Sequence, residues 1–198
     1  IEAKVGGNEI VLKDRVVHHA VYRTPHMLHY HIDVGHPVVA EGSRYLAPVR
    51  DVIWAAHAGE DYKTQQVSYR RYAAPKLNFR EQVWEFDMAT DRAGNVPVAI
   101  VNDQLNFGLL VETSKAELPC QYQWQNFQSG LYTVGIEPGT HHILGKDFAR
   151  DRGELIWLEH DDERRYTVRF TILDGADKTK AVEKRIHTLS PQPQNDYP

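Results

Sequence analysis

Hydrophobic residues occur along the chain in short runs that polar positions interrupt and turn-forming residues separate. β-Branched and aromatic residues dominate these runs, for example in QVWEFDMAT (82–90), VPVAIVND (96–103) and FGLLVETS (107–114). Glycine, proline, asparagine and aspartate lie between the runs, as at Asp174-Gly175. Many short strands at this close spacing are typical of a sandwich or a barrel, so the pattern predicts an all-β, mostly antiparallel fold.

Seven further runs are predicted as strands and one segment as a helix. The strands are EIVLKDRVVHHAVY (9–22), HMLHYHIDV (26–34), DVIWAAH (51–57), QQVSYRRYA (65–73), YTVGIE (132–137), RGELIWLEH (152–160) and RYTVRFTILD (165–174). The helix candidate is DKTKAVEKRIHTL (177–189). Because no repeat or linker interrupts residues 1–190, we expect them to form one domain. A polar, proline-rich tail (191–198) follows and is expected to fray.

Composition narrows the classes of partner. The chain has 198 residues and a net charge of −4, from 23 basic and 27 acidic residues without a long run of one sign. This balance argues against nucleic acid and anionic membranes as partners. Cys120 is the only cysteine, which excludes an intramolecular disulfide and favours a reducing compartment, the cytoplasm. The sequence has neither glycine-rich phosphate-binding motifs nor a G-x-S-x-G motif, so we expect no nucleotide and no other cofactor.

Histidines gather in one segment, HMLHYHIDVGH, which holds four of the 11. On a strand, His29 and His31 point to the same face, because side chains alternate. Two imidazoles on one face suit a metal site, or a cleft in which one imidazole donates a proton, and they also occur as surface pairs without function. Metal-binding cupin barrels place a glutamate three or four residues after His-x-His, whereas the next acidic residue here is Asp33. A metal site therefore stays an alternative that would need distant ligands, such as His141 or His142.

A second segment, CQYQWQNF (120–127), is both polar and aromatic and suits the wall of a cleft. Tyr122 and Trp124 could stack on the face of a sugar, although an aromatic residue here could equally pack in the core. Gln123 could bind sugar hydroxyls, since an amide both donates and accepts hydrogen bonds. Arg44 is a candidate contact for an anionic or phosphorylated sugar, with an ordinary surface arginine as the alternative.

The segments that carry these residues resemble one known superfamily. ELPCQYQWQNFQSGLYTVGIEPGTHH (117–142) is similar to the closing active-site segment of the aldose 1-epimerase superfamily, the galactose mutarotase-like proteins. TPHMLHYHIDVGHPVVAEGSRYLAP (24–48) is similar to their middle segment. The resemblance covers most of residues 1–190. It is greatest to a branch of uncharacterised aldose 1-epimerase-like proteins, whose middle segment reads approximately P-x-x-L-x-Y-H-x-N-x-G-x-P.

The resemblance implies a β-supersandwich whose concave face holds a sugar. In this superfamily a glutamate takes the proton of the anomeric hydroxyl and a histidine protonates the ring oxygen, so the ring opens and then closes to the other anomer. Residue-by-residue matching places the glutamate at Glu137 and the histidine at His31. The protein is thus expected to be an isomerase of carbohydrate metabolism, an aldose 1-epimerase (mutarotase) without metal or cofactor, whose partner is a small-molecule aldose. Five further residues are expected to bind the sugar: His29, Asp33, Arg44, Gln123 and Trp124.

The sequence departs from the superfamily in its length and at one position of the middle segment. Asp33 stands where the branch has asparagine, which adds a negative charge beside His31. Superfamily members are longer and carry another active-site histidine on earlier strands. The chain opens IEAKVGGNEIVLKD, without methionine. We therefore expect it to be the middle and C-terminal part of a longer polypeptide, able to associate with a missing N-terminal segment.

Two other functions stay open at this point. One is a non-catalytic carbohydrate-binding domain on the same scaffold. The other is a metal-dependent sugar isomerase that uses the histidine cluster. Saturable sugar binding without anomer exchange would favour the first, and bound metal in the purified protein would favour the second.

Overall fold

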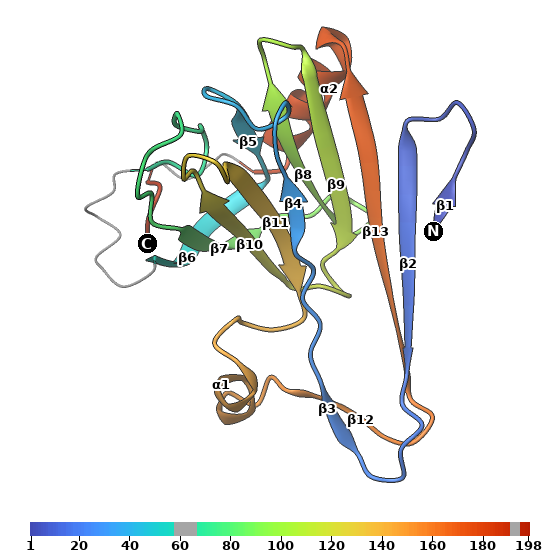
Figure 1. Cartoon of the computed structure of the whole chain (residues 1–198). Coiled ribbons are helices and arrows are strands. Elements are labelled where there is room, and N and C mark those ends of the chain that lie inside the picture. Colours follow the sequence, from blue (N-terminus) through green and yellow to red (C-terminus); the bar gives the residue numbers. More distant parts are fainter. Residues whose placement is uncertain (58–66, 191–194) are drawn as a thin grey trace.

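Two antiparallel β-sheets face each other in the computed structural model, which describes residues 1–57, 67–190 and 195–198 (Figure 1). The larger sheet has the strand order β1-β2-β13-β9-β8-β5 and the smaller one β4-β11-β10-β7-β6. The larger sheet consists of β1 (Glu2–Ala3), β2 (Glu9–Val17), β5 (Arg44–Leu46), β8 (Asn95–Asn102), β9 (Phe107–Ser114) and β13 (Glu163–Asp174). The smaller sheet consists of β4 (Ile32–Val34), β6 (Val49–His57), β7 (Gln82–Met88), β10 (Cys120–Asn126) and β11 (Thr133–Gly139).

The hydrophobic core lies between the two sheets. The larger sheet contributes Val98, Ile100 and Val111, and the smaller sheet contributes Trp84 and Ile136, none of them more than 2% exposed. Side chains alternate along each strand, so one face of the smaller sheet packs in this core and the opposite face points away from it.

Two helices and a short ribbon complete the described structure. Helix α2 (Ala176–His187) covers the outer face of the larger sheet, where Ile186 packs on residues of β8 such as Ala99 and Val101. Helix α1 (Lys146–Asp151) follows the end of β11. The ribbon pairs β3 (Thr24–His26) with β12 (Ile156–Leu158) and extends below both sheets in Figure 1. Neither helix in the described ranges is long and apolar enough to cross a lipid bilayer.

The predicted all-β, antiparallel fold is confirmed, since every pairing between these strands is antiparallel. The predicted C-terminal helix is confirmed as α2. Helix α1 and strand β10 were not predicted. β10 escapes the hydrophobic pattern because glutamines fill its core-facing positions and bond to backbone carbonyls, as Gln123 does with Tyr69.

Several strand predictions are wrong in part, among them 26–34, 65–73 and 152–160, where only Ile156–Leu158 of the last is a strand. In 26–34 only Ile32–Val34 joins a strand of the smaller sheet, while His26 ends β3 and both His29 and His31 lie on the irregular segment between β3 and β4. Of 65–73, residues 65 and 66 lie outside the described residues, and 67–73 form no strand. Tyr69 and Tyr72 are buried there, and Tyr72 N–H donates to the carbonyl of Ser43 over 2.9 Å. The alternation of hydrophobic and polar residues in 67–73 therefore reflects packing in the core and not a regular strand.

The C-terminal residues 195–198 lie against the core. Tyr197 O–H donates to the carbonyl of Val67 over 2.6 Å, and its ring lies 5.9 Å from that of Trp84. The indole N–H of Trp84 donates to the carbonyl of Asp196 over 2.9 Å. The tail is polar in composition, but it includes one aromatic residue, Tyr197, which packs against the core. The preceding part of the predicted tail, 191–194, lies outside the described residues.

Candidate functional site

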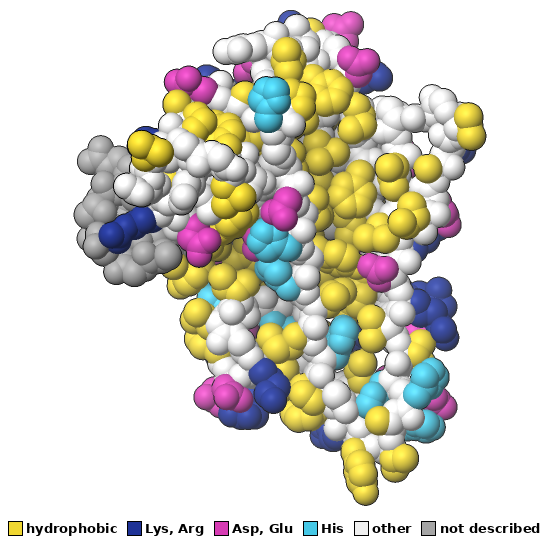
Figure 2. Space-filling model, in the orientation of Figure 1, with side chains coloured by type: hydrophobic (Ala, Val, Ile, Leu, Met, Phe, Trp, Pro, Cys, Tyr) yellow, Lys and Arg dark blue, Asp and Glu magenta, His cyan; other side chains and the backbone are white. Residues whose placement is uncertain are grey.

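One transverse row of side chains crosses the smaller sheet on the face opposite the core. The strand register places Glu137 of β11 beside Tyr122 of β10, Tyr122 beside Glu85 of β7, and Glu85 beside Trp54 of β6. Residues directly opposite one another on neighbouring strands share a face. Two carboxylates and two aromatic rings are therefore aligned across four strands. Figure 2 shows histidine and acidic side chains gathered near the middle of one face of the molecule.

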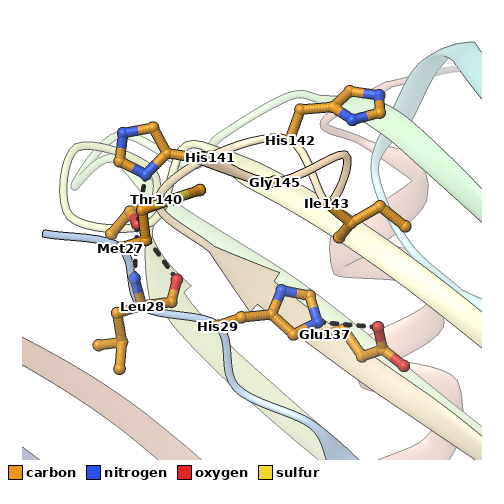
Figure 3. Close-up of a pocket in the computed structure, with 9 residues that line it drawn as sticks. All are labelled: Met27, Leu28, His29, Glu137, Thr140, His141, His142, Ile143 and Gly145. Atoms are coloured by element: carbon orange, nitrogen blue, oxygen red, sulfur yellow. Dashed lines mark hydrogen bonds and ion pairs between the residues drawn. The ribbon is translucent and has the colours of Figure 1, made fainter. Parts of the chain in front are cut away.

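Two imidazoles contact the Glu137 carboxylate, one at each oxygen. His29 Nε2 is hydrogen-bonded to Oε2 over 2.9 Å, and His31 Nε2 lies 2.9 Å from Oε1 (Figure 3 draws the first contact). Only 5% of the Glu137 side chain is exposed, against 46% for His31. The other ring nitrogen of His31, Nδ1, lies 3.0 Å from Asp33 Oδ1. Each nitrogen of His31 thus lies within 3.0 Å of a carboxylate oxygen.

Backbone hydrogen bonds hold the His29 segment against the end of β11. Tyr30 N–H donates to the carbonyl of Pro138 over 3.0 Å, and Thr140 N–H donates to the carbonyl of Leu28 over 2.9 Å. The Thr140 hydroxyl also accepts from Leu28 N–H over 2.9 Å. These bonds fix both ends of the short segment that carries His29, although no regular strand contains it.

A glycine makes room for the Glu137 carboxylate. Gly135 precedes Glu137 by two residues on the same face of β11. A Cβ at position 135 would overlap Glu137 Oε1 and would lie 3.2 Å from His31 Cε1. The carboxylate and the imidazole therefore occupy the space that any other residue at 135 would fill.

A cavity of about 420 Å³ opens beside this cluster (Figure 3). Its lining combines a few polar groups with apolar ones, as is usual in small-molecule sites. The lining residues are Met27, Leu28, His29, Glu137, Thr140, His141, His142, Ile143 and Gly145. His141 is a structural residue, because its Nδ1 bonds to the Thr140 hydroxyl over 2.8 Å and its Nε2 to the carbonyl of Glu154 over 2.8 Å.

Glu85 forms a second carboxylate–imidazole pair that the sequence reasoning missed. His142 Nε2 lies 2.8 Å from Glu85 Oε2, and only 5% of the Glu85 side chain is exposed. Burial raises the pKa of the Glu85 carboxyl above its ordinary value, against the lowering effect of Tyr122 and His142. Burial also raises the pKa of the nearby Cys120 thiol to about 11, so that thiol is a poor nucleophile at neutral pH. A charged residue between two core aromatics, in Trp84-Glu85-Phe86, was the available signal.

The structure brings most of the predicted site residues together. His29, His31, Asp33 and Glu137 form the contacts above, and the ring of Trp124 lies 5.2 Å from that of His31. The indole N–H of Trp124 donates to Glu81 Oε2 over 3.0 Å. These residues therefore lie together around Glu137, while their roles stay predictions.

Two predicted substrate contacts lie elsewhere. Gln123 is fully buried on the core face of β10, where its amide donates to the carbonyl of Tyr69 over 3.1 Å, because strand alternation turns it away from Trp124. Arg44 forms ion pairs with Asp103 and Glu183 at the other sheet. The prediction that Gln123 and Arg44 contact the substrate is therefore corrected.

Within the described parts of the chain, no group of three or more histidine, cysteine, aspartate or glutamate side chains is arranged to hold a metal ion. The imidazoles of His29, His31 and His142 each lie within 2.9 Å of a carboxylate oxygen.

Comparison with known proteins gives one family and several similar structures. The profile of the family described as "Domain of unknown function (DUF4432)" matches residues 1–172. A "putative aldose 1-epimerase" from Klebsiella pneumoniae is similar with a TM-score of 0.83 and 26% identity, over 94% of this chain and 48% of that chain. A "putative aldose 1-epimerase" from Escherichia coli K12 has a TM-score of 0.58 and 15% identity, over 83% and 56%. No curated protein matches the sequence.

A "galactose mutarotase-like protein" from Clostridium acetobutylicum is also similar, with a TM-score of 0.53 and 15% identity, over 83% of this chain and 52% of that chain. These likenesses show that the fold is of the galactose mutarotase-like type. The chain spans about half the length of these solved proteins.

Proposed function

Since the chain belongs to the DUF4432 family and has the mutarotase-like fold, we propose that it binds an aldose beside Glu137 and interconverts the two anomers. The observation that carries the proposal is the Glu137 carboxylate, which is buried, lines a cavity and is contacted at its two oxygens by His29 and His31. A carboxylate held this way on a strand has the fixed aim that a general base needs.

The reaction requires only proton transfers, two as the ring opens and two as it closes. Glu137 takes the proton from the anomeric hydroxyl while His31 donates a proton to the ring oxygen. The C1–O5 bond breaks and leaves an open-chain aldehyde with a new hydroxyl at C5. Rotation about the C1–C2 bond exposes the other face of the aldehyde. The hydroxyl then attacks C1, His31 takes its proton back, and Glu137 returns its proton to O1, so no atom or electron is gained or lost.

The two groups suit these roles for different reasons. The carboxylate of Glu137 accepts protons only when ionised, and it has two oxygens to offer. His31 is nearly half exposed, so its ring can turn from Glu137 to a substrate oxygen, while Asp33 holds Nδ1. Each acid–base group contributes about 10²–10⁴-fold to the rate.

The proposed activity is tested with freshly dissolved pure α-anomers of glucose and galactose, followed by polarimetry and by NMR exchange spectroscopy. The wild-type protein is expected to speed the approach to anomeric equilibrium. Glu137→Gln keeps the shape of the side chain but removes the proton acceptor, so exchange should fall by about 10²-fold or more with little change in sugar affinity.

Glu159→Gln is the matched control, because this carboxylate is 64% exposed and pairs with Arg23 outside the cavity. It should exchange anomers at the wild-type rate. Wild-type exchange in Glu137→Gln would remove this residue from the mechanism. Saturable sugar binding by wild type without any exchange would support a carbohydrate-binding domain instead.

A further inference from the structure

A second cavity, of about 800 Å³, adjoins the one at Glu137. The two cavities share the lining residues Thr140, His141 and His142. The second cavity extends from this shared wall past Glu85 to Trp54 and to Phe148 of helix α1. Both volumes fall in the range of small-molecule sites, about 300–1,000 Å³. The proposed anomer exchange uses only the first cavity.

The row of residues across the sheet sets the length of the combined site. Neighbouring strands lie about 4.8 Å apart, so the three spacings between Glu137 and Trp54 amount to about 14 Å. One sugar ring anchored by its anomeric centre at Glu137 cannot reach Trp54. A second ring joined to the first can.

The chemistry of the second cavity suits a sugar ring. Glu85 Oε2 is buried and accepts no hydrogen bond within the described residues, although His142 lies 2.8 Å away. Glu85 lines the cavity, and a ligand hydroxyl that reached its carboxylate would be stabilised there, since a buried carboxylate oxygen without a hydrogen bond is costly. The rings of Trp54 and Phe148 lie 5.1 Å and 5.0 Å from that of His142, which gives the cavity flat apolar walls for the C–H faces of a pyranose.

The charges of the second cavity favour an uncharged ring. Among the described residues that line it, the acidic ones are Glu85 and Glu154, and the one arginine or lysine is Arg152. Arg152 Nε already bonds to Glu154 Oε1 over 2.7 Å, and its guanidinium lies over the ring of Phe148. An anionic sugar would therefore meet more negative charge than positive charge here.

From these observations we infer that the cavity between Glu85, His142 and Trp54 binds the second, neutral ring of a disaccharide whose reducing end lies at Glu137. The inference rests on the proposed function, because the reducing end is the part on which anomer exchange acts. It names the substrate class as neutral disaccharides with a free anomeric centre, in preference to monosaccharides.

The test compares glucose with cellobiose, maltose and lactose, all of which carry glucose at the reducing end. For wild type, KM for anomer exchange and Kd from calorimetry should be lower for at least one disaccharide than for glucose. Because a hydrogen bond to a charged group is among the stronger ones in proteins, we expect a preference of about 10-fold or more. In Trp54→Ala and in Glu85→Gln the ratio of the glucose constant to the disaccharide constant should fall towards one, for KM and for Kd alike. Glu85→Gln keeps the side-chain shape, so it tests the inference even if Trp54→Ala folds poorly.

Trp157→Ala is the matched control for Trp54→Ala, because Trp157 is 39% exposed and stacks on Arg23 outside both cavities. It should leave the ratio at the wild-type value. Equal constants for glucose and all three disaccharides in wild type would overturn the inference and leave the anomer exchange standing. Tighter disaccharide binding that Trp54→Ala abolishes, without exchange of any sugar, would support the second-ring site and overturn the proposed reaction.

Discussion

Gly135 and Glu137 share one face of β11, and the carboxylate of Glu137 fills the space that a side chain at Gly135 would occupy. The backbone of Gly135 is not in the left-handed region that favours glycine. Space, not conformation, is therefore what position 135 requires. An alanine there could adopt the backbone angles but would collide with Glu137 Oε1 and press on His31.

Gly135→Ala should accordingly lower anomer exchange by about 10-fold or more, because overpacking costs about 1–3 kcal/mol and displaces the base from its histidine contacts. The measurement is the exchange rate per folded molecule, with folding checked by circular dichroism. A variant that folds and exchanges anomers normally would show that the carboxylate position is not critical.

Gly108→Ala provides a matched control on β9 of the larger sheet. A Cβ at position 108 would lie 2.6 Å from the carbonyl oxygen of Ile100, so this variant is also overpacked. It should lose thermal stability while its folded fraction exchanges anomers at the wild-type rate. An equal loss of exchange in both variants would mean that the effect of Gly135→Ala is general destabilisation.

The two histidines at Glu137 should differ in their effect on exchange. His31→Gln removes the proposed acid, which Asp33 holds at its second nitrogen, and exchange should fall by about 10²-fold or more. His29→Gln removes one hydrogen bond to Glu137, and a loss of about 10-fold is expected. The exchange rates of both variants at saturating sugar show which substitution is the more damaging. If His29→Gln proved the more damaging change, the acid role would pass to His29.

Arg44→Met should affect stability and its pH dependence. The hydrogen bonds from Arg44 lower the pKa of both the Asp103 and Glu183 carboxyls. Lowered folded-state pKa values stabilise the protein above the ordinary values of 3.8 and 4.5, and this stabilisation disappears as the pH falls through the folded-state values. We expect a loss of about 1–2 kcal/mol at neutral pH, allowing for solvent screening at the half-exposed Asp103.

Urea unfolding of Arg44→Met and wild type from pH 7 down to the acid limit measures this loss, which should shrink at acid pH. Anomer exchange by the folded variant should stay normal, because Arg44 is at the other sheet. A raised KM with normal stability would restore the substrate contact that the sequence suggested for Arg44.

The sequence predicts the sheets well but not the faces on which individual side chains lie. β-Branched runs such as 107–114 depend on local preference and hydrophobic pattern, and they became strands. Gln123 and Trp124 are adjacent, yet one is buried in the core and the other lies beside His31. Choosing between the two faces needs the register with β7 and β11, which depends on residues far away in sequence.

In the candidate site, too, the residues found from the sequence were those with a local signal, and the residues missed depend on distant contacts. Glu137 and His31 were found through local motifs that resemble those of a known superfamily, and the structure places them in contact. Glu85 escaped because its significance comes from burial and from His142, 57 positions later in the chain. The role of Gly135 escaped for a similar reason, since a glycine in a strand gives no sign of which side chain fills the adjacent space.

Tyr197→Ala should destabilise the protein although the residue lies next to the C-terminal end of the described chain. The variant loses the hydrogen bond to Val67 and the ring contact with Trp84. We expect a loss of about 2–4 kcal/mol, somewhat below that for a fully buried aromatic residue. Thermal unfolding of this variant and of Tyr22→Ala, an exposed tyrosine, measures the difference. Equal unfolding temperatures would mean that residues 195–198 do not stabilise the core.

Glu85→Gln should stabilise the protein at neutral pH relative to wild type. Burial raises the pKa of Glu85 in the folded state above its ordinary value of 4.5, so the folded protein binds this proton more tightly than the unfolded chain does. As the pH rises through the interval from 4.5 to the raised value, the folded state must ionise a buried carboxyl, and the free energy of unfolding falls. Glutamine resembles the protonated form and does not ionise.

The advantage of Glu85→Gln over wild type should therefore be small below about pH 4.5, grow through that interval and then level off. Urea unfolding at closely spaced pH values measures it, with the exposed Glu159→Gln as a control that should shift stability by less than about 0.5 kcal/mol at every pH. The ion pair with His142 acts in the opposite direction, because it favours the ionised carboxylate. If Glu85→Gln is less stable than wild type at neutral pH, the attraction to His142 outweighs the cost of burial, and the pKa of Glu85 is not raised in the folded protein.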